Sequence, residues 1–409
     1  MVDRILIVGA GQAAAQAIDT LRRKGFKGTL TLIGSEPHFP YQRPPLSKKY
    51  LSGALERDRL LIRPAHFYTE HGVAARLGRR ADLIDRERRC VRLDDGSVVE
   101  YDALLLATGS KPRHIVTPGA NLAGVHYLRN IADVERLRPD LTAGKRLVIV
   151  GGGYIGLEVA ATARELGLDV TVLEMADRLM NRVTCSEVSA FYAAEHSKHG
   201  VRIVCNARVE ALHGSGGGSA ERVRAVACHD GTEYPADIVL VGVGVVPEDE
   251  LARDAGLECL NGIVIDQHCR TADPHIFAAG DCTSHPSIHY GRHLRLESVD
   301  NAFEQGTSAA LNMLGTPTPH DKVPWFWSDQ YDLKMVIVGL STGYDSVVLR
   351  GSPAARSFSA CYLFRGELIA VDTVNNPKDQ MAARKLVAAR ARPDPAKLAD
   401  TTLALKDCL

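Results

Sequence analysis

Two stretches of the chain share one pattern of apolar and polar positions: a short apolar run, a glycine-rich turn and then a helical periodicity. Residues 5–11 read Ile-Leu-Ile-Val-Gly-Ala-Gly, and residues 147–153 read Leu-Val-Ile-Val-Gly-Gly-Gly. A short apolar run of this kind is typical of a buried parallel strand. Because a second apolar run follows each helical stretch, residues 1–35 and the segment that begins at Lys145 each predict a β-α-β unit.

Turn residues and further apolar runs predict the next elements. Residues 91–99 carry an Asp-Gly turn between two short apolar runs and predict a hairpin. A Pro-rich connection follows the first β-α-β unit, and a short helix is expected to start at about Pro45. Residues 104–110 predict a buried strand that ends in a glycine turn, residues 238–246 predict one apolar strand, and Gly214–Ser219 predicts a hairpin tip.

The pattern changes from Val323 onward. An aromatic triplet, residues 325–327, precedes runs with strand-like alternation, and a helix rich in alanine and basic residues is expected after Asn376-Pro377. The strands are expected around residues 336–339, 346–349, 360–364 and 368–371. This pattern of strands and a helix predicts a separate α+β domain at the end of the chain.

Length and pattern together predict three domains from 409 residues. Residues 1–111 form the first part of one domain, and residues 247–322 are expected to return to it and complete it. Residues 112–246 form a second domain around the second β-α-β unit. Residues 323–409 form the C-terminal α+β domain.

The first glycine-rich turn has the features of a dinucleotide-binding loop. Gly9 permits the tight turn, Gly11 lets the backbone approach a pyrophosphate, and Ala14 is small enough for close packing of helix on strand. The N–H groups at the helix start then favour the anion. Glu36 ends the second strand, about 20 residues further on, where an acidic residue binds a ribose diol.

The second turn repeats this arrangement with Gly151, Gly153 and Gly156, and Glu174 takes the place of the acidic residue. A carboxylate at this position repels the 2′-phosphate of NADPH, so NADH is favoured. Arg178 lies nearby and leaves this preference open to test. Two such loops in one chain predict two dinucleotides, most economically a flavin at one loop and a nicotinamide at the other.

A third motif supports a flavin. The segment Thr271–Asp281 reads as a strand that delivers Gly280 and Asp281 to a turn. Gly280 permits a close approach to a ligand, and the carboxylate of Asp281 can accept a hydrogen bond from a ribityl hydroxyl.

Together with the Ala-Thr-Gly turn at residues 107–109, these motifs resemble those of two-dinucleotide flavoproteins of the glutathione-reductase type. Over essentially the whole chain, the sequence resembles one branch, the NADH-dependent ferredoxin reductases of bacterial oxygenase systems. The segments that carry this resemblance are Pro40–Lys48, Gly151–Glu158, Arg295–Val299 and Phe326–Gln330. The resemblance implies an α/β fold with two Rossmann-like domains, the first for FAD and the second for NADH, and a C-terminal α+β domain.

The resemblance also implies the residues that bind FAD. They are Gly9, Gly11, Ala14, Glu36, Arg43, Pro45, Lys48, Ala107, Thr108, Gly109, Gly280, Asp281, Ser298, Val299 and Trp327. Lys48 is expected near the reactive edge of the flavin, where a cation stabilises charge on the reduced ring. Ser298 is a natural N-cap whose helix can direct N–H groups at the flavin, and Trp327 is expected beside the ring.

By the same resemblance, NADH is expected to contact Gly151, Gly153, Tyr154, Ile155, Gly156, Glu158, Glu174 and Glu297. Glu158 is expected at the nicotinamide carboxamide, and Tyr154 either stacks on the flavin or fills the core. Lys48, Glu158 and Trp327 are the expected catalytic residues. Hydride passes directly between stacked rings, so the reaction requires positioning and no acid–base pair or metal.

Composition and charge exclude several other classes. Lys+Arg and Asp+Glu are equal at 49 each, which argues against nucleic-acid binding. No run is long and apolar enough for a membrane span, and no secretory signal segment is found at the start, so a cytoplasmic location is expected. The 9 cysteines are scattered singly, which argues against a zinc site, an iron–sulfur cluster or a redox disulfide within the chain.

The expected partner is a [2Fe-2S] ferredoxin that serves a ring-hydroxylating dioxygenase or a cytochrome P450, met transiently by a local basic patch. Arg292, Arg295 and Lys334 are the hypothesised members of that patch. The alternatives are a rubredoxin reductase, an NADH oxidase or disulfide reductase, and a redox-signalling flavoprotein related to apoptosis-inducing factor. The sequence leaves open whether the protein is a monomer or a homodimer.

Overall fold

The structure is a computed structural model and describes residues 2–216 and 221–409. The chain divides into two compact units. Unit 1 contains the chain up to Gln42, Arg57–Lys111 and Val246–Pro324. Unit 2 contains Arg43–Glu56, Pro112–Val245 and Trp325–Leu409. The segment Arg43–Glu56 therefore packs with unit 2, although unit 1 residues flank it in the sequence.

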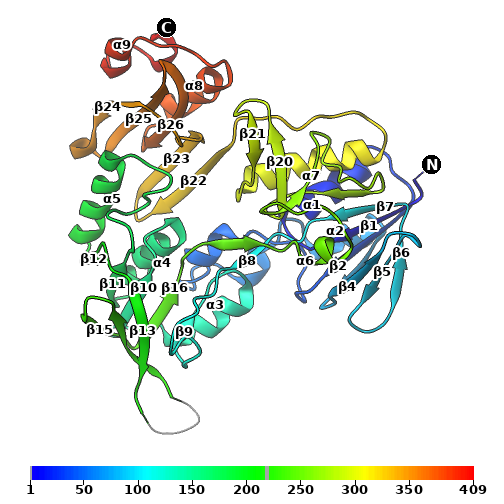
Figure 1. Ribbon diagram of the computed structural model, residues 1–409, viewed down its shortest axis with the longest axis horizontal. Coiled ribbons are helices and arrows are strands. Elements are labelled where there is room, and N and C mark those ends of the chain that lie inside the picture. The colour runs from blue at the N-terminus through cyan, green and yellow to red at the C-terminus, as the bar shows by residue number, and fades with distance from the viewer. Residues whose placement is uncertain (1, 217–220) are drawn as a thin grey trace. The chain divides into compact units, whose positions relative to one another are not determined.

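Unit 1 is built on a parallel sheet in the order β19-β7-β1-β2-β3. Figure 1 labels its strands β7, β1 and β2. Its strands are β1 (Arg4–Val8), β2 (Thr29–Gly34), β3 (Val73–Leu77), β7 (Ala103–Leu106) and β19 (Ile276–Ala278). Helix α1 (Gln12–Arg23) connects β1 to β2, which confirms the predicted β-α-β unit. The apolar run of β1 is buried, and both neighbouring strands run parallel to it, as a fully buried strand requires.

Helix α7 (Val299–Met313) lies beside α1 in unit 1 (Figure 1). The two backbones approach closely at Gly306, where an added Cβ would lie 2.5 Å from the carbonyl oxygen of Ala13. The remaining elements of unit 1 are η2 (Arg57–Leu60), α2 (Ala65–Glu70), β4 (Ala81–Asp85), β5 (Cys90–Leu93), β6 (Val98–Glu100), α6 (Glu250–Asp254), β18 (Ile263–Val264), β20 (Thr283–Ser287) and β21 (Arg292–Leu294). Strands β5 and β6 pair antiparallel and confirm the predicted hairpin.

Unit 2 contains a second parallel sheet, in the order β12-β11-β10-β16-β9. Its strands are β9 (Val125–His126), β10 (Arg146–Val150), β11 (Asp169–Leu173), β12 (Arg202–Val204) and β16 (Ile238–Val241). The helices are α3 (Ile131–Leu137), η3 (Arg138–Asp140), α4 (Tyr154–Glu165) and α5 (Ser186–Lys198). Because α4 joins β10 to β11, the second predicted β-α-β unit is also confirmed.

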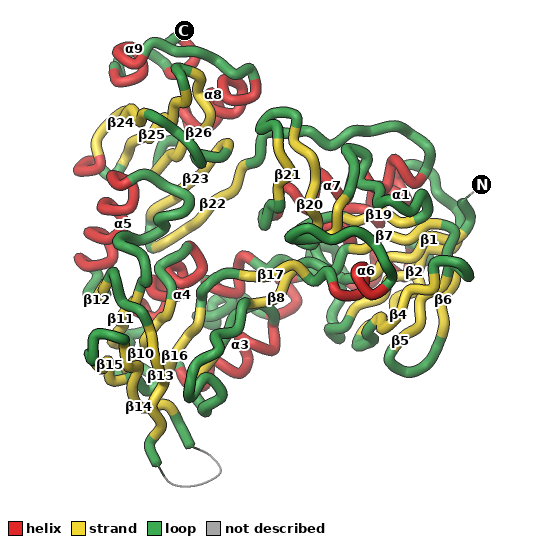
Figure 2. The backbone as a smooth tube through the Cα atoms, in the orientation of Figure 1, coloured by secondary structure: helices red, strands yellow, loops and turns green. Residues whose placement is uncertain are grey.

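A smaller antiparallel sheet in unit 2 contains β13 (Val209–Gly214), β14 (Val223–Cys228) and β15 (Glu233–Pro235). Strands β13 and β14 form a hairpin (Figure 2). The predicted hairpin tip, Gly214–Ser219, begins at the end of β13, and its residues 217–219 lie outside the described residues.

The prediction of a single strand over residues 238–246 is wrong. The run divides into β16 and β17 (Val245–Pro247), and β17 pairs with β8 (Ser110–Pro112). Between them, Gly242 donates its N–H to the carbonyl of Val150 at 2.8 Å, and Gly244 has a φ of +103°. Hydrophobicity alone gave no sign of this break, because glycine conformation rather than polarity causes it.

The C-terminal part of unit 2 is an antiparallel sheet in the order β22-β23-β26-β25-β24 (Figure 2). The strands are β22 (Trp325–Gln330), β23 (Leu333–Gly339), β24 (Ser346–Ser352), β25 (Ser357–Phe364) and β26 (Glu367–Val374). The helical segments are η4 (Pro353–Ala355), α8 (Pro377–Ala388), α9 (Pro395–Ala399) and η5 (Leu405–Asp407). The four predicted strands and the helix after Asn376 are confirmed, and the aromatic triplet forms a fifth strand that was not predicted.

One face of this sheet packs on helices α4 and α5. Directly opposed residues share a face of a sheet, and the register places Phe326, Ile337, Asp372 and Ala360 opposite one another in turn. On this face, the ring of Phe326 lies 4.7 Å from that of Tyr154 on α4, centroid to centroid. The C-terminal strands therefore cover the helix that begins at the second glycine-rich loop.

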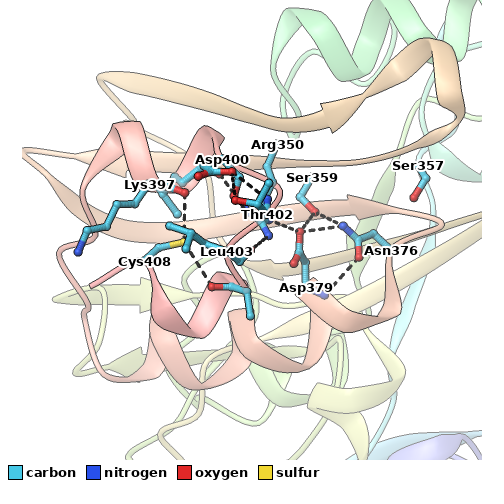
Figure 3. Close-up of polar contacts among 12 residues, drawn as sticks. Arg350, Ser357, Ser359, Asn376, Asp379, Lys397, Asp400, Thr402, Leu403 and Cys408 are labelled. Atoms are coloured by element: carbon cyan, nitrogen blue, oxygen red, sulfur yellow. Dashed lines mark hydrogen bonds and ion pairs between the residues drawn. The ribbon is translucent and has the colours of Figure 1, made fainter.

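The opposite face of the same sheet holds the end of the chain through one buried arginine (Figure 3). Arg350 on β24 is 5% exposed, and its Nε lies 3.0 Å from Oδ2 of Asp379 at the start of α8. Its other nitrogens donate to the backbone carbonyls of Leu398, Asp400 and Leu403. The same Asp379 oxygen accepts from Ser359 at 2.8 Å. Arg350 thus ties α8 and the last turns of the chain to the sheet.

Two general features bear on the expectations from the sequence. All nine cysteines are free thiols, and six of them are buried. Among the described residues, no helix combines the length and the apolar character needed to cross a membrane.

We expect Arg350→Ala to lower the free energy of unfolding by about 3–5 kcal/mol, because it leaves the buried carboxylate of Asp379 without its cation and three backbone carbonyls without the guanidinium donor. Thermal unfolding monitored by circular dichroism measures this effect. Arg390→Ala is the control, because that side chain is 49% exposed and lies 3.9 Å from Glu367. Equal melting temperatures for the two variants would contradict the role given to Arg350.

Candidate functional site

The first glycine-rich loop, in unit 1, contains two glycines with different surroundings: Gly9 packs against backbone, and Gly11 faces open space. Gly9 has a φ of +107°, and an added Cβ would lie 2.1 Å from the carbonyl oxygen of Ala107. An added Cβ on Gly11 would meet nothing within 4 Å. Gly11 is also the N-cap of α1 and provides no side-chain cap, so the first N–H groups of that helix can receive an anion.

The ends of the neighbouring strands bring the other predicted flavin residues of unit 1 to the same edge of the sheet. Ala107, Thr108 and Gly109 follow β7, and Gly280 and Asp281 follow β19, which pairs with β7 in parallel. Ligands of such sheets bind beyond the carboxyl ends of the strands.

Hydrogen bonds fix the acidic residues of this edge. Asp281 accepts from the hydroxyl of Ser110 at 2.8 Å, and Glu36 at the end of β2 accepts from the hydroxyl of Tyr41 at 2.6 Å. Each carboxylate therefore has a defined orientation and retains acceptor capacity for a ligand hydroxyl.

Ser298 and Val299 begin α7 as predicted. The Ser298 hydroxyl accepts from the N–H of Asn301 at 3.1 Å, which is the geometry of an N-cap. Gln305, two turns into the helix from the cap, was not predicted. It is fully buried, and its Oε1 accepts from the N–H of Gly280 at 2.8 Å and from the hydroxyl of Thr283 at 2.9 Å. A single helical glutamine gives no sequence signal for such a role.

The second glycine-rich loop, in unit 2, also contains glycines that pack against backbone and a glycine that faces open space. Gly151 has a φ of +110°, and its added Cβ would lie 2.4 Å from the carbonyl oxygen of Gly242. Gly156 is similarly close to the carbonyl oxygen of Gly151, at 2.4 Å. An added Cβ on Gly153 would meet nothing within 4 Å, and Ile155 beside it is 45% exposed. Gly151 and Gly156 close the turn, whereas Gly153 leaves space for a ligand.

Glu174 directly follows β11 and contacts this loop. Its Oε2 accepts from the N–H of Gly152 at 2.7 Å, and its Oε1 accepts from the N–H of Ala176 at 2.8 Å. The nearby cation, Arg178, donates to the carbonyls of Thr184 at 2.8 Å and Asn181 at 3.0 Å. The carboxylate thus faces the loop, and the guanidinium is engaged with backbone.

Three elements of unit 2 meet at a buried carboxylate. Glu158 on α4 is 6% exposed, and its Oε2 lies 2.6 Å from Nζ of Lys48. The hydroxyl of Ser47 donates to the same oxygen at 2.5 Å, and the hydroxyl of Ser328 on β22 donates to Oε1 at 2.7 Å. Two predicted catalytic residues, Lys48 and Glu158, are therefore directly paired.

The turn that carries Lys48 is the short helix predicted near Pro45. It is a 3₁₀ helix, η1 (Pro44–Ser47), and the hydroxyl of Thr162 on α4 donates to the carbonyl of Ser47 at 2.9 Å. Nζ of Lys48 also donates to the carbonyl of Pro44 at 3.2 Å. Arg43, at the N-terminal end of η1, donates to the carbonyl of Arg129 at 2.7 Å.

The predicted aromatic residues lie on or against β22. The rings of Trp325 and Trp327 are 5.6 Å apart, and the guanidinium of Arg384 lies 3.9 Å from the centroid of the Trp325 ring. Tyr154 packs edge-on against Phe326, and burial raises the pKa of its hydroxyl well above the usual value. Tyr154 is thus half-buried at the start of α4, with its ring against β22.

Two other predicted residues are paired with each other. Arg295 Nη1 lies 2.5 Å from Oε1 of Glu297, both in unit 1, and the arginine side chain is 13% exposed. Arg295 is therefore neutralised and mostly buried. Of the hypothesised basic patch, Arg292 and Lys334 are the exposed members.

Comparisons with known proteins agree with this geometry. Residues 3–306 match the family described as pyridine nucleotide-disulphide oxidoreductase, and residues 325–409 match the family described as reductase C-terminal. The ferredoxin–NAD(+) reductase component of an anthranilate 1,2-dioxygenase system from Burkholderia cepacia is 42% identical, over 100% of this chain and 99% of that protein.

Two solved structures are also similar. The ferredoxin reductase for the CYP199A2 system from Rhodopseudomonas palustris has a TM-score of 0.95 and 41% identity, over 100% of both chains. The reductase in the covalent putidaredoxin reductase–putidaredoxin complex has a TM-score of 0.95 and 41% identity, over 99% of this chain and 98% of that one.

We expect Gly153→Ala to fold normally and to weaken NADH binding by at least about tenfold, because the new methyl group projects into the open loop where a pyrophosphate must approach. Gly151→Ala is the matched comparison and is expected to destabilise the fold, since its methyl group meets backbone. Titration with NADH and thermal unfolding measure the two effects. Unchanged NADH binding by Gly153→Ala would refute the assignment of this loop.

Proposed function

Because the chain belongs to the pyridine nucleotide-disulphide oxidoreductase family and, within it, to the ferredoxin reductases of oxygenase systems, we propose that it transfers electrons from NADH through FAD to a [2Fe-2S] ferredoxin. That ferredoxin in turn serves a ring-hydroxylating dioxygenase or a cytochrome P450. One observation gives this proposal its strongest support. The chain contains two loops of the same design, and each has a glycine, Gly11 or Gly153, that faces open space.

The residues of unit 1 fit FAD. The uncapped start of α1 provides N–H groups for the pyrophosphate, and Glu36 and Asp281 provide fixed carboxylates for hydroxyl groups. The 15-residue helix α7 begins at Ser298 and Val299, so its N-terminal N–H groups can stabilise negative charge on the ligand. When bound, FAD supplies the redox chemistry, since it accepts a hydride and releases electrons one at a time.

Lys48 is the cation proposed for the reactive edge of the flavin. An ammonium has three donors, and the contacts of Lys48 within the described chain use two of them, on Glu158 and on Pro44. The remaining donor can be directed at the ligand. Glu158 holds Lys48 in place, and the other residues of unit 2 proposed to bind FAD are Arg43, Pro45 and Trp327. The role of this part of the chain is to position charge before the reaction.

The residues of the second loop fit NADH rather than NADPH. Gly153 gives access to the pyrophosphate, and Glu174 lies where a 2′-phosphate would meet a negative charge. Arg178 donates to backbone carbonyls and is therefore committed elsewhere. Tyr154, Ile155 and Glu297 stay proposed NADH contacts.

The proposal that the electron acceptor is a ferredoxin rests on the cysteine positions in the sequence and on the partners of the similar proteins. Disulfide reductases use a reactive cysteine or a cysteine pair. The sequence has no two cysteines close together in the chain, and the described residues contain no disulfide. The similar reductase structure is that of a complex with putidaredoxin, and the similar dioxygenase component is a ferredoxin reductase. These observations support a one-electron protein acceptor.

We expect the purified FAD-containing protein to oxidise NADH slowly alone and at least about tenfold faster with a [2Fe-2S] ferredoxin, because the acceptor proposed for electrons of the reduced flavin is a one-electron protein. Absorbance of NADH and an oxygen electrode follow both reactions together. NADH oxidation that is fully matched by oxygen uptake and indifferent to ferredoxins would instead indicate an oxidase.

We expect Glu174→Arg to raise the ratio of kcat/KM for NADPH to that for NADH by at least about tenfold, because a repulsive charge becomes an attractive one. The charge-matched control is Glu210→Arg, at an exposed position on β13 of the same unit. Steady-state kinetics with both nucleotides give the ratio. A ratio that moves equally in the control would remove Glu174 from the recognition site.

A further inference from the structure

A buried series of hydrogen bonds leads from α5 to the carboxylate of Glu158. The hydroxyl of Tyr331 lies 3.2 Å from Nδ1 of His196, and Nε2 of His196 lies 2.8 Å from Oε1 of Gln330. Nε2 of Gln330 donates to the hydroxyl of Ser328 at 3.2 Å, and that hydroxyl donates to Glu158 at 2.7 Å. The series joins α5, β22 and α4 within unit 2.

The chemistry of its members fixes the direction of every bond. A carboxylate only accepts, so Ser328 donates its single proton to Glu158. Ser328 must then accept, and the amide nitrogen of Gln330 is its donor. The amide oxygen of Gln330 only accepts, so His196 carries its proton on Nε2. Nδ1 of neutral His196 is left as an acceptor for Tyr331, and every proton in the series points toward Glu158.

The direction of these hydrogen bonds is important because the series is buried. Ser328 and His196 are 0% exposed, and Gln330 is 1% exposed. Desolvation lowers the pKa of His196, which keeps the imidazole neutral and able to accept from Tyr331. In a site of low dielectric constant, aligned hydrogen bonds polarise one another, and a buried group that loses its partner is costly.

The strand geometry explains how the series is built. Ser328 and Gln330 are two residues apart on β22, so both side chains lie on the face that covers α4 and α5. Ser328 meets Glu158 on α4, and Gln330 meets His196 on α5. Strand β22 thus supplies the donor for Oε1 of Glu158, whereas Ser47 and Lys48 contact Oε2.

We propose that Ser328, Gln330 and His196 are positioning residues that hold the Glu158–Lys48 ion pair in the geometry needed for flavin reduction by NADH. This inference rests on the proposed function. None of the three residues touches the reacting atoms. They act through Glu158, whose orientation fixes the ammonium of Lys48, and misplacement of a charged group by a fraction of an ångström is enough to slow a reaction.

Gln330→Glu tests the direction of the series with a side chain of nearly the same shape. A carboxylate at this position accepts from Ser328 and draws its proton away from Glu158. His196→Leu removes the donor to Gln330, whereas His196→Gln retains an N–H at the same reach and serves as the conservative rescue. Tyr192→Phe is the matched control, because Tyr192 is a buried residue on the same helix whose hydroxyl bonds to no group among the described residues.

The experiment is anaerobic stopped-flow reduction of the FAD-loaded proteins by NADH. We expect Gln330→Glu and His196→Leu to lower the limiting rate of flavin reduction at least about tenfold, while the dissociation constant for NADH changes less than about threefold. His196→Gln and Tyr192→Phe are expected to stay within about threefold of the unmodified protein in both quantities.

A limiting rate in Gln330→Glu equal to that of the unmodified protein would overturn the proposal, as would an equal loss in His196→Gln and His196→Leu. If Gln330→Glu does not fold, Ser328→Ala removes the last donor with a smaller change, and an unchanged limiting rate there would likewise overturn it. If the unmodified protein is not reduced by NADH at all, the proposed function itself fails, so the two failures are distinguishable.

Discussion

A carboxylate removed from water must be surrounded by donors, and the way this chain satisfies Glu158 determines much of the architecture of unit 2. Taking a charge out of water costs several kcal/mol unless a cation and hydrogen bonds replace the solvent. Lys48 and Ser47 come from one segment, Ser328 comes from another, and Glu158 stands on the helix between them. The residues 43–56 and the C-terminal strands therefore pack around α4. Because the pairing brings together segments far apart in the sequence, this packing is a condition of the site as well as of the fold.

The two glycine-rich loops show how one motif separates stability from binding. In each loop the first glycine takes a positive φ and lies against the carbonyl of a neighbouring turn, Ala107 for Gly9 and Gly242 for Gly151. The glycine two residues later takes an ordinary φ and faces open space. The sequence motif contains both requirements without distinguishing them. In the structure, the first glycine of each loop is required by close backbone packing, whereas the other glycine leaves the space that the proposed ligand needs.

The sequence predicted the elements of the fold where apolar periodicity and glycine turns coincide. Both β-α-β units, the hairpin at residues 91–99 and the C-terminal strands follow from local patterns. Its failure over residues 238–246 originates in tertiary contact. The break after Val241 depends on Gly242 lying against another loop.

The candidate site shows the same limit. Gly11, Gly153, Lys48 and Glu158 follow from motifs and resemblance, because a ligand-binding loop has a fixed local spacing. Gln305, Gln330 and His196 have no such spacing. Each is a single polar residue in a helix or strand, and its role depends on a partner from another element. Sequence patterns identify groups that contact a ligand more readily than groups that orient them.

The absence of a cysteine pair gives the Glu158 site its significance. In a disulfide reductase, the thiol pair stores two electrons and changes its own bonding with each turnover. A protein that releases electrons singly has no use for that store, but it still needs a group that stabilises charge while reduced flavin is present. A cation held by a fixed carboxylate provides this without any covalent change. Lys48 and Glu158 are the residues proposed for that need, and the buried hydrogen bonds to Glu158 restrict the positions open to the flexible side chain of Lys48.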